Sequence, residues 1–304
     1  MSTIARIDFL KYRPLFYFLS FLLFATFVAG ILYRIQTRGA VFSYSVDFTG
    51  GTQAMLKFSR KVSNDEVTRV LTAGGMEGVS IRELASSELG GHVLMVRVKS
   101  HEADAKGIAG RMVEQLGAKL KDVKVEILGT DSVGESVGSE LRRQSVWVVL
   151  LCLLLLLLYI GWRFKSFAFG MGAIVALIHD AVAILTYVIW FDYEISLNII
   201  AAILFVLGYS TNDTIVVFSR IREHFNKHEP GSADAIANLS INETLRRTLL
   251  VSFATCLTVL ALLIFGGEVL RSLSVALLIG MVFGTYSSIY IATPVMLLLH
   301  KEKK

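Results

Sequence analysis

The chain has 304 residues, of which 54% are hydrophobic and only 18% are charged, and its formal net charge is +5. A mean hydropathy of +0.61 is too apolar for an ordinary soluble domain and indicates a membrane protein. An excess of Lys and Arg in a membrane protein usually reflects its topology and its contact with anionic lipid headgroups. The sequence also has no basic stripe with interleaved aromatic residues, the pattern typical of nucleic-acid binding. Membrane lipids are therefore expected as neighbours, and no nucleic-acid partner is expected.

Two cysteines, Cys152 and Cys256, both lie within apolar runs. A disulfide framework or a thiolate metal site is therefore not expected. Both residues are typical of small hydrophobic packing positions, and we predict neither a metal nor another cofactor.

Six apolar runs are long enough to cross a bilayer, which takes about 20 residues. The first run follows Arg6, Lys11 and Arg13 and is longer than the apolar core of a signal peptide, so we predict a retained membrane anchor. The predicted spans cover residues 14–33, 144–162, 167–190, 195–218, 248–265 and 273–299.

Loop charges set the predicted orientation. Arg163 and Lys165 lie between spans two and three, and five basic residues lie in the 219–247 connection, whereas residues 191–194 contain no Lys or Arg. The positive-inside rule then predicts that the N-terminus (1–13), the 219–247 loop and the tail (300–304) are cytoplasmic. The polar segment 34–143 is predicted on the outside.

The external segment alternates short strands with amphipathic helices. Strands are predicted at 52–58, 79–84, 92–98 and 123–127, with a Gly90-Gly91 turn between the second and the third. One helix is predicted to begin at the capping box that Ser63 opens, and a second is predicted to begin at about residue 102. The βαββαβ order is typical of a ferredoxin-like α+β domain, so the predicted fold is a six-span α-helical membrane protein with one such external domain. Its free sheet face and edge strands are natural docking surfaces for an extended chain.

Asp213 is a carboxyl inside an otherwise apolar span. An ionised carboxyl there costs about 2.5–3.5 kcal/mol even on lenient insertion scales, so such a residue is usually functional, most often as a proton or ion site. Ser210 and Asn212 precede it in a polar interruption of the same span. The alternative is a hydrogen-bonded residue that only packs helices together.

Arg247 opens span five on the same predicted inner side as Asp213. A permanently charged guanidinium can hold the deprotonated carboxylate and release it on protonation, which would convert proton flux into helix movement. The alternative for Arg247 is a positive-inside anchor at the membrane interface. Both interpretations stay open at this point.

Asp180 is a second carboxyl, near the middle of span three, and either a proton relay or a structural hydrogen bond is consistent with it. His179 is next to it but about 100° away around the helix, so the two are not expected to share a face. Thr248, Ser252 and Thr255 lie on one face of span five, where they either line a water path or satisfy backbone carbonyls. Gly280 and Gly284 predict a close-packing face in span six.

Six short motifs stand in order along the chain: Asp47-Phe48-Thr49-Gly50-Gly51-Thr52, Ser136-Val137-Gly138, His179-Asp180, Gly208-Tyr209-Ser210 with Asn212-Asp213, Arg220-Ile221-Arg222-Glu223 and Arg247-Thr248. In sequence and order these motifs resemble those of the SecD/SecF family, of the resistance-nodulation-division superfamily. The span-four motif and the short external domain resemble the SecF branch. One departure is Gly134-Glu135 where many relatives have Gly-Pro, and Ser132-Val133-Gly134 offers a second register for the second motif.

The resemblance implies a non-enzymatic, multi-pass subunit of the bacterial cytoplasmic (inner) membrane. It would pair with SecD and the SecYEG channel, and with YajC, and use the proton-motive force to promote late-stage export of unfolded preproteins. Asp213, Arg247 and Asp180 would carry the proton relay, with support from His179, Ser210, Asn212, Thr248 and Ser252.

Two other functions are consistent with parts of the sequence. A single-unit, proton-coupled exporter of lipids or hydrophobic small molecules would use the same six-span unit. An intramembrane aspartyl protease would pair Asp180 with Asp213, but the Gly-x-Gly-Asp context is absent. No HExxH, Gly-x-Ser-x-Gly or Walker A pattern occurs, so we expect no hydrolytic energy coupling within this chain.

Overall fold

The computed structural model describes residues 7–84, 92–99, 104–120 and 123–300. The predicted Gly90-Gly91 turn and residues 301–304 of the predicted tail lie outside these ranges. The chain forms two compact units, one containing residues 1–43, 147–193 and 198–304 and the other containing residues 44–146 and 194–197. We describe each unit separately.

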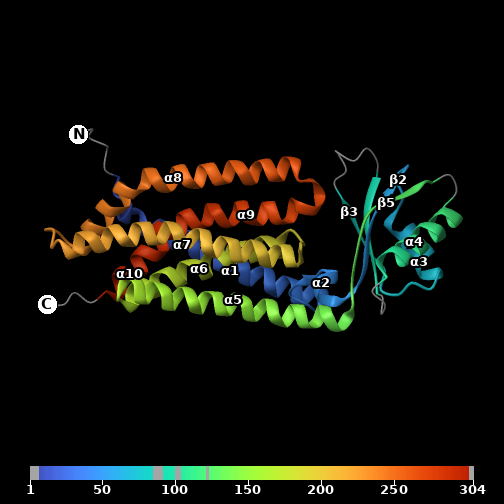
Figure 1. The fold of residues 1–304 in the computed structure, drawn as a ribbon, viewed down its shortest axis with the longest axis horizontal. Helices are drawn as coiled ribbons and strands as arrows, with labels where there is room; N and C mark the ends of the chain where they lie inside the picture. Colours follow the sequence, from blue (N-terminus) through green and yellow to red (C-terminus); the bar gives the residue numbers. More distant parts are fainter. Residues whose placement is uncertain (1–6, 85–91, 100–103, 121–122, 301–304) are drawn as a thin grey trace. The chain divides into compact units, whose positions relative to one another are not determined.

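The first unit is a helical bundle that confirms the six predicted spans among the described residues (Figure 1). Its helices are α1 (Arg13–Arg38), α5 (Glu135–Phe164), α6 (Phe167–Trp190), α7 (Leu197–Asn226), α8 (Ala233–Phe265), α9 (Gly267–Ser287) and α10 (Thr293–Leu299), with a short 3-10 turn η1 (Leu10–Tyr12) before α1 and a π-helical turn η2 (Ser288–Ala292) between α9 and α10. Helix α5 begins in the second unit and continues into the bundle.

Two helices extend past the predicted spans. Helix α7 continues to Asn226 and α8 already begins at Ala233, so only residues 227–232 of the predicted 219–247 loop are non-helical. Charged residues such as Arg, Lys and Glu are good helix formers and let a helix continue beyond the apolar core of a bilayer. Ser232 caps α8 by accepting a hydrogen bond from the Ala235 amide.

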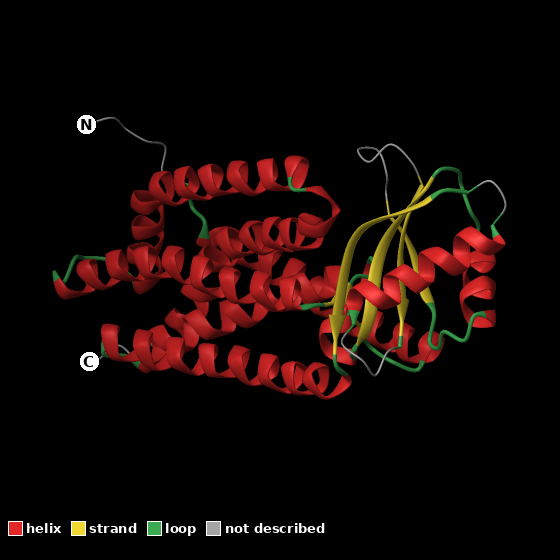
Figure 2. Cartoon of the chain, turned by 45° about the vertical axis from the view of Figure 1, so that its right-hand side comes forward, coloured by secondary structure: helices red, strands yellow, loops and turns green. Residues whose placement is uncertain are grey.

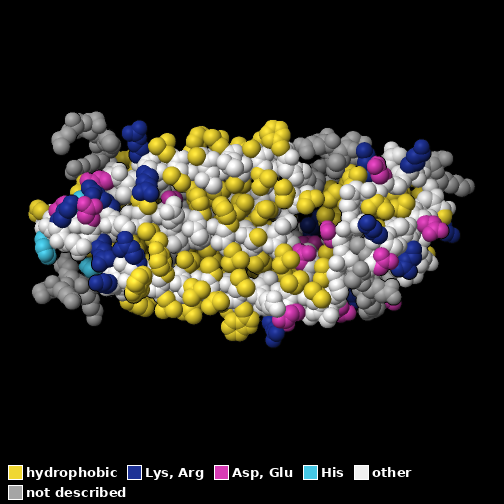
Figure 3. Space-filling model, in the orientation of Figure 1, with side chains coloured by type: hydrophobic (Ala, Val, Ile, Leu, Met, Phe, Trp, Pro, Cys, Tyr) yellow, Lys and Arg dark blue, Asp and Glu magenta, His cyan; other side chains and the backbone are white. Residues whose placement is uncertain are grey.

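Helix α6 is the centre of the bundle. Within the bundle's own packing, 67% of its most apolar window is buried, against 6% for α1 and 11% for α5. The apolar outer side chains of α1 and α5 therefore suit contact with lipid. On the visible face, hydrophobic side chains cover the middle of the bundle and charged side chains gather at one end (Figure 3).

The second unit is built on a four-stranded antiparallel sheet. Its elements are a short helical turn α2 (Val46–Thr49), β2 (Gly51–Phe58), α3 (Asn64–Ala73), β3 (Ser80–Leu84), β4 (His92–Val98), α4 (Ala105–Lys119) and β5 (Val125–Val133), and a separate two-stranded pair is formed by β1 (Ser43–Tyr44) and β6 (Glu194–Ile195). The strand order β3-β4-β2-β5 and the βαββαβ connection confirm the predicted ferredoxin-like fold.

Helices α3 and α4 cover one face of this sheet (Figure 2). The core between them contains Leu56, Phe58 and Leu94 from the strands and Leu71 and Met112 from the helices. Alternate residues of β2 are buried, as period-2 alternation in a half-covered sheet requires.

Strand β5 departs from the predicted alternation. In the sequence, Val123, Val125 and Ile127 alternate with Lys124 and Glu126, which indicates a half-buried strand, yet Ile127 is 40% exposed. The register between β2 and β5 shifts after Met55, where Gly129 is the partner, to Leu56, where Ile127 is the partner. Ile127 pairs with the buried Leu56, so its side chain is on the helix-covered face, and its exposure reflects the place of β5 at the edge of the sheet. The bulge follows Ile127 and shifts the pairing of the residues from Gly129 onward, which the local sequence does not indicate.

Candidate functional site

Asp213 is buried in the bundle, with 2% of its surface exposed. Its Oδ2 atom accepts a hydrogen bond of 3.4 Å from the hydroxyl of Ser252 on α8, which is also 3.0 Å from the hydroxyl of Thr285 on α9. The carboxyl on α7 is thus connected to two other spans through a single serine. Thr285 was not predicted, because a lone Thr in an apolar run carries little signal.

Arg247 is exposed on α8, and no ion pair or hydrogen bond joins it to Asp213 among the described residues. Its charge acts on Asp213 only through space. The physical reason is helical rotation: Thr248 and Ser252 are four residues apart and face the same way, whereas Arg247 is turned by about 100° from Thr248. The direct contact stays a prediction for another arrangement of the two helices.

Two buried hydroxyls near Asp213 have no hydrogen-bond partner within the described protein. They are Oγ1 of Thr214, the next residue on α7, and Oγ1 of Thr248, one turn from Ser252 on α8. Thr255, the third residue of the predicted polar face, instead donates to the carbonyl of Val251. Buried hydroxyls usually have a hydrogen-bond partner, so these two have unused hydrogen-bonding capacity, which the hydroxyl of Thr255 does not have.

Asp180 is fully buried, at 0% exposure, and receives three donors. Oδ2 accepts hydrogen bonds from Ser210 on α7, at 2.6 Å, and from Ser287 on α9, at 2.9 Å. Nδ1 of His179 lies 3.4 Å from Oδ1. Asp180 is therefore the polar centre through which α6 is hydrogen-bonded to α7 and α9.

The expectation that His179 and Asp180 point apart is wrong for their side chains, which bend toward each other. The other ring nitrogen of His179 lies 3.2 Å from the hydroxyl of Ser20 on α1, and this hydroxyl is 2.5 Å from that of Tyr286 on α9. Tyr286 in turn donates to the carbonyl of Phe16. Sequence reasoning missed Ser20, Tyr286 and Ser287, whose only signal is a polar side chain inside an apolar run.

Helix α9 therefore contacts both carboxyl sites through three consecutive residues. Thr285 reaches Ser252 beside Asp213, Tyr286 reaches Ser20, and Ser287 binds Asp180. The π-helical turn η2 follows directly. A π-helical turn inside a span is rare and frequent at functional sites, because it shifts the residues on either side relative to each other.

The predicted close-packing face of Gly280 and Gly284 lies against α7. A Cβ atom at Gly280 would come within 2.3 Å of the Val206 side chain, and one at Gly284 within 3.1 Å of Ser210. The two glycines thus allow the approach that places Ser210 and Ser287 on the same carboxyl oxygen. Asn212, predicted as a supporting residue, is exposed on α7 and faces away from both sites.

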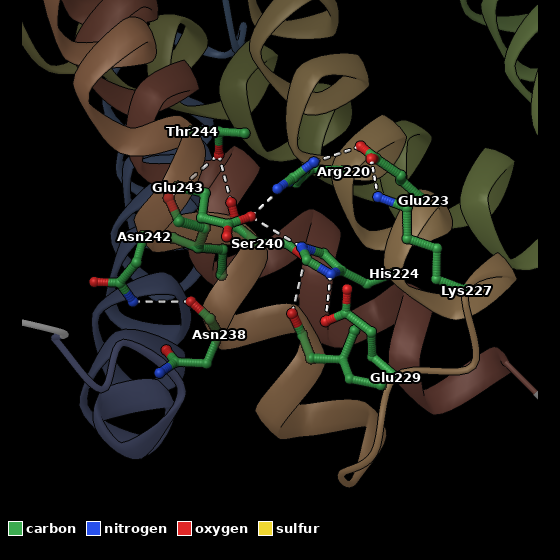
Figure 4. A network of polar contacts seen from close by, with 12 residues as sticks. Arg220, Glu223, His224, Lys227, Glu229, Asn238, Ser240, Asn242, Glu243 and Thr244 are labelled. Atoms are coloured by element: carbon green, nitrogen blue, oxygen red, sulfur yellow. Dashed lines mark hydrogen bonds and ion pairs between the residues drawn. The ribbon is translucent and has the colours of Figure 1, made fainter. Parts of the chain in front are cut away.

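At the cytoplasmic-side ends predicted for α7 and α8, a second polar network joins the two helices (Figure 4). Arg220 binds Glu223 and Glu243, and His224 lies between Glu243 and Glu229. Lys227 completes the network by pairing with Glu223 at 2.6 Å. Arg220 therefore joins α7 to α8 through Glu243, Glu223 pairs within α7, and neither residue takes part in either carboxyl site.

Two motifs that are far apart in the sequence meet in the second unit. Gly50 and Gly51 have φ angles of +72° and +112°, which only glycine adopts without strain. A Cβ at Gly138 would come within 2.8 Å of the Gly50 amide nitrogen. Asp47 accepts hydrogen bonds from the Ser45 hydroxyl and the Leu197 amide. The 47–52 motif and the Ser136-Val137-Gly138 motif, which starts α5, thus form one tightly packed junction.

Among the described residues, no group of three or more His, Cys, Asp or Glu side chains is placed to hold a metal ion. Cys152 and Cys256 are both free and half-buried. The sites described above therefore consist of hydrogen-bonded carboxyls, hydroxyls and one imidazole.

Comparisons with known proteins agree with this arrangement. Residues 112–302 match the family model described as protein export membrane protein SecD/SecF, C-terminal. The "Protein translocase subunit SecF" of Sebaldella termitidis is 35% identical over 288 residues, which cover 93% of this chain and 90% of that protein. The protein of the same name from Escherichia coli O157:H7 is 35% identical over 264 residues, covering 86% of this chain and 80% of that protein.

A solved structure is also similar. The crystal structure of SecDF from Thermus thermophilus, titled a translocon-associated membrane protein, superimposes with a TM-score of 0.84 at 32% sequence identity. The match covers 98% of this chain and 39% of that longer chain. Sequence, motif order and fold agree across nearly the whole chain, and we conclude that it belongs to the SecD/SecF family of protein-export membrane proteins.

Proposed function

We propose that this chain is an auxiliary subunit of the Sec translocase that uses the proton-motive force, together with SecD, to promote late-stage export of unfolded preproteins. The carrying observation is Asp213, a carboxyl inside a span that is 2% exposed and held by one long hydrogen bond from Ser252. A weakly held buried carboxyl is suited to exchange its proton within a working cycle. The similarity to subunits named for protein translocation supports the export role.

The partner proposal rests on the SecDF relative. This chain matches 39% of that protein, whose title names both SecD and SecF in one chain. We infer that SecD supplies the complementary half, and that SecYEG, and YajC where present, complete the assembly. The exposed Asn212 side chain in the middle of α7 is a polar group that a neighbouring membrane subunit would satisfy.

The topology proposal is that both termini are cytoplasmic, in the bacterial inner membrane. The N-terminal end of α1 and the C-terminal end of α10 lie at the same end of the bundle, where charged side chains also gather (Figures 1 and 3). The basic residues of this end follow the positive-inside rule. Asp213 then lies in the inner half of its span.

The proposed proton path enters Asp213 through the hydroxyls of Thr214 and Thr248, which have no other partner among the described residues. Deprotonation gives Asp213 a negative charge that attracts the guanidinium of Arg247 and favours the arrangement in which the two meet. Protonation neutralises Asp213 and removes this attraction. Asp180 is the second relay group, connected to the Asp213 helix through Ser210.

The test is preprotein translocation into membrane vesicles containing this chain and SecD, measured with ATP alone and with ATP plus an imposed proton gradient. Asp213→Asn keeps the size and hydrogen bonding of the side chain but cannot titrate. We expect the ATP-only rate to be unchanged and the increment from the gradient to be lost. Glu126→Gln, at an exposed carboxyl outside the spans, serves as the matched control, and a normal increment in Asp213→Asn would refute the proposal.

A further inference from the structure

The cluster at the ends of α7 and α8 is built around a single carboxylate. Oε2 of Glu243 on α8 accepts a hydrogen bond of 2.5 Å from Nε of Arg220 and lies 2.9 Å from Nε2 of His224, and both partners are on α7 (Figure 4). Among the described residues, this is where charged side chains join the two helices. Glu223 and Lys227 are on α7 itself, and their pair does not cross to α8.

His224 is enclosed by this cluster, with 3% of its surface exposed. Its Nδ1 atom lies 2.7 Å from Oε2 of Glu229, in the short connection between the helices, although the angle is not that of a hydrogen bond. A carboxylate oxygen therefore lies close to each of the two ring nitrogens of His224. The charged groups that face it are Arg220 from α7, Glu229 from the connection and Glu243 from α8.

The cluster and the Asp213 site lie on the same pair of helices at matching heights. From Asp213 to His224 along α7 the rise is about 16 Å, and from Ser252 back to Glu243 along α8 it is about 14 Å. One antiparallel register therefore satisfies both the Asp213–Ser252 bond and the Glu243 contacts. A shift of one helix by a turn would break both.

This register also explains the place of Arg247. Its Cα atom is about 7 Å nearer the Glu243 end of α8 than that of Ser252, and its side chain is turned by about 100° from the Thr248 face. A slide of α8 by about one turn, with a rotation, would bring the guanidinium toward Asp213. The Glu243 contacts oppose both movements.

We propose that Glu243, bound by Arg220 and His224, locks the register of α7 and α8 and thereby holds Asp213 on Ser252 and away from Arg247. Glu243, Arg220 and His224 are positioning residues, since none of them touches Asp213. The consequence for transport rests on the proposed function, because an Asp213–Arg247 contact matters only if Asp213 exchanges protons. The register itself does not depend on it.

The experiment measures the register by disulfide formation in the bilayer, in full-length chains whose Cys152 and Cys256 are replaced by alanine. One reporter carries Asp213→Cys and Ser252→Cys, and the other carries Asp213→Cys and Arg247→Cys. A disulfide requires Cβ atoms about 3.5–4.5 Å apart, so only the first reporter is expected to form one efficiently when the cluster is intact. The yields are compared after mild oxidation.

Glu243→Gln keeps the side-chain volume but removes the charge that both partners hold. We expect the yield of the 213–252 disulfide relative to the 213–247 disulfide to fall about fivefold or more, the change that loss of one favourable coupling produces. His224→Gln, which leaves Arg220 on Glu243, is expected to give a smaller fall. Lys227→Gln, which breaks only the pair within α7, is the matched control and should leave the ratio unchanged.

An unchanged ratio in both Glu243→Gln and His224→Gln would overturn the proposal. Loss of both disulfides would overturn it as well, because a lock that only sets register leaves the helices packed. Since Asp213 is replaced in both reporters, the outcome is independent of proton transfer. A failed proton-gradient test with a successful register test would therefore refute the proposed function and leave the lock in place.

Discussion

Ser210 on α7 donates a hydrogen bond of 2.6 Å to Asp180 on α6, and Asp213 follows Ser210 by one helical turn. The two buried carboxyls are thus connected along a single helix. Helix α9 connects them again through Thr285 and Ser287. A change at either carboxyl therefore acts on the same two helices, which is the geometry that a bistable helix contact requires.

Removing a donor from Asp180 should destabilise the bundle. We expect Ser210→Ala and Ser287→Ala each to lower the free energy of unfolding by about 1–3 kcal/mol, because a buried carboxyl loses a donor that no water replaces. The measurement is thermal or denaturant unfolding of the full chain in detergent. Ser274→Ala is the control, since this buried hydroxyl binds only the Leu270 carbonyl of its own helix. Equal, small effects for all three variants would contradict the role of Asp180 as the hub.

The approach of α9 to α7 should not tolerate a methyl group at Gly280. A Cβ there meets the Val206 side chain at 2.3 Å. We expect Gly280→Ala to cost about 1–3 kcal/mol through overpacking and to weaken the Ser287–Asp180 bond. Gly161→Ala on α5 is the control, because nothing lies within 4 Å of the position that its Cβ would take. If the two variants unfold at the same denaturant concentration, the close-packing assignment is wrong.

The ion pairs between the C-terminal end of α1 and the residue Asp192 after α6 should contribute to stability in a pH-dependent way. Arg34 and Arg38 lie 2.7 and 2.8 Å from Asp192. Partial burial alone would raise the pKa of Asp192, but the hydrogen bonds from Arg38 and Arg34 outweigh it, so the pKa lies below its ordinary value. A carboxyl with a lowered folded-state pKa stabilises the fold above its ordinary pKa, and this contribution is lost as the pH falls through the lowered value.

Asp192→Asn should therefore unfold more readily than the parent chain at neutral pH, and the difference should shrink below about pH 4. Unfolding midpoints measured across the acid range check this. Glu126→Gln, at an exposed carboxyl on β5, provides the comparison for general charge effects. A difference that grows toward low pH would have the wrong sign for this ion-pair cluster.

The junction of the two motifs in the second unit should depend on Gly50. Its φ of +72° costs an L-residue about 1–2 kcal/mol, and a Cβ would lie 2.5 Å from the Cα of Glu135. We expect Gly50→Ala to speed hydrogen exchange in β2 and at the start of α5 in the full chain. Gly129→Ala on β5 has free space and should leave these amides protected. Unchanged protection in Gly50→Ala would show that the junction is not tightly packed.

The local sequence was sufficient for the elements themselves. Apolar runs of about 20 residues define spans because a bilayer admits only backbone that satisfies its own hydrogen bonds, and period-2 and period-3.6 patterns define the strands and helices of the second unit. Asp213 and Asp180 can also be identified from the local sequence, because a carboxyl within an apolar run is unusual whatever side chains it contacts. The bulge in β5 and the helical extensions of α7 and α8 carry no comparable local signal.

Which of these residues meet depends on the packing of the elements against one another. Ser287 on Asp180, Gly138 against Gly50, and Ser252 in place of Arg247 beside Asp213 all follow from how neighbouring helices are rotated and how far each is slid along the other. A hydrophobic pattern defines which face of a helix is apolar. It does not fix how far the helix is slid along its neighbour, because a slide of one turn presents nearly the same apolar face. Six spans, one ferredoxin-like unit and two intramembrane carboxyls can therefore be inferred from the order of residues, whereas the register of α6, α7, α8 and α9 sets what each carboxyl binds.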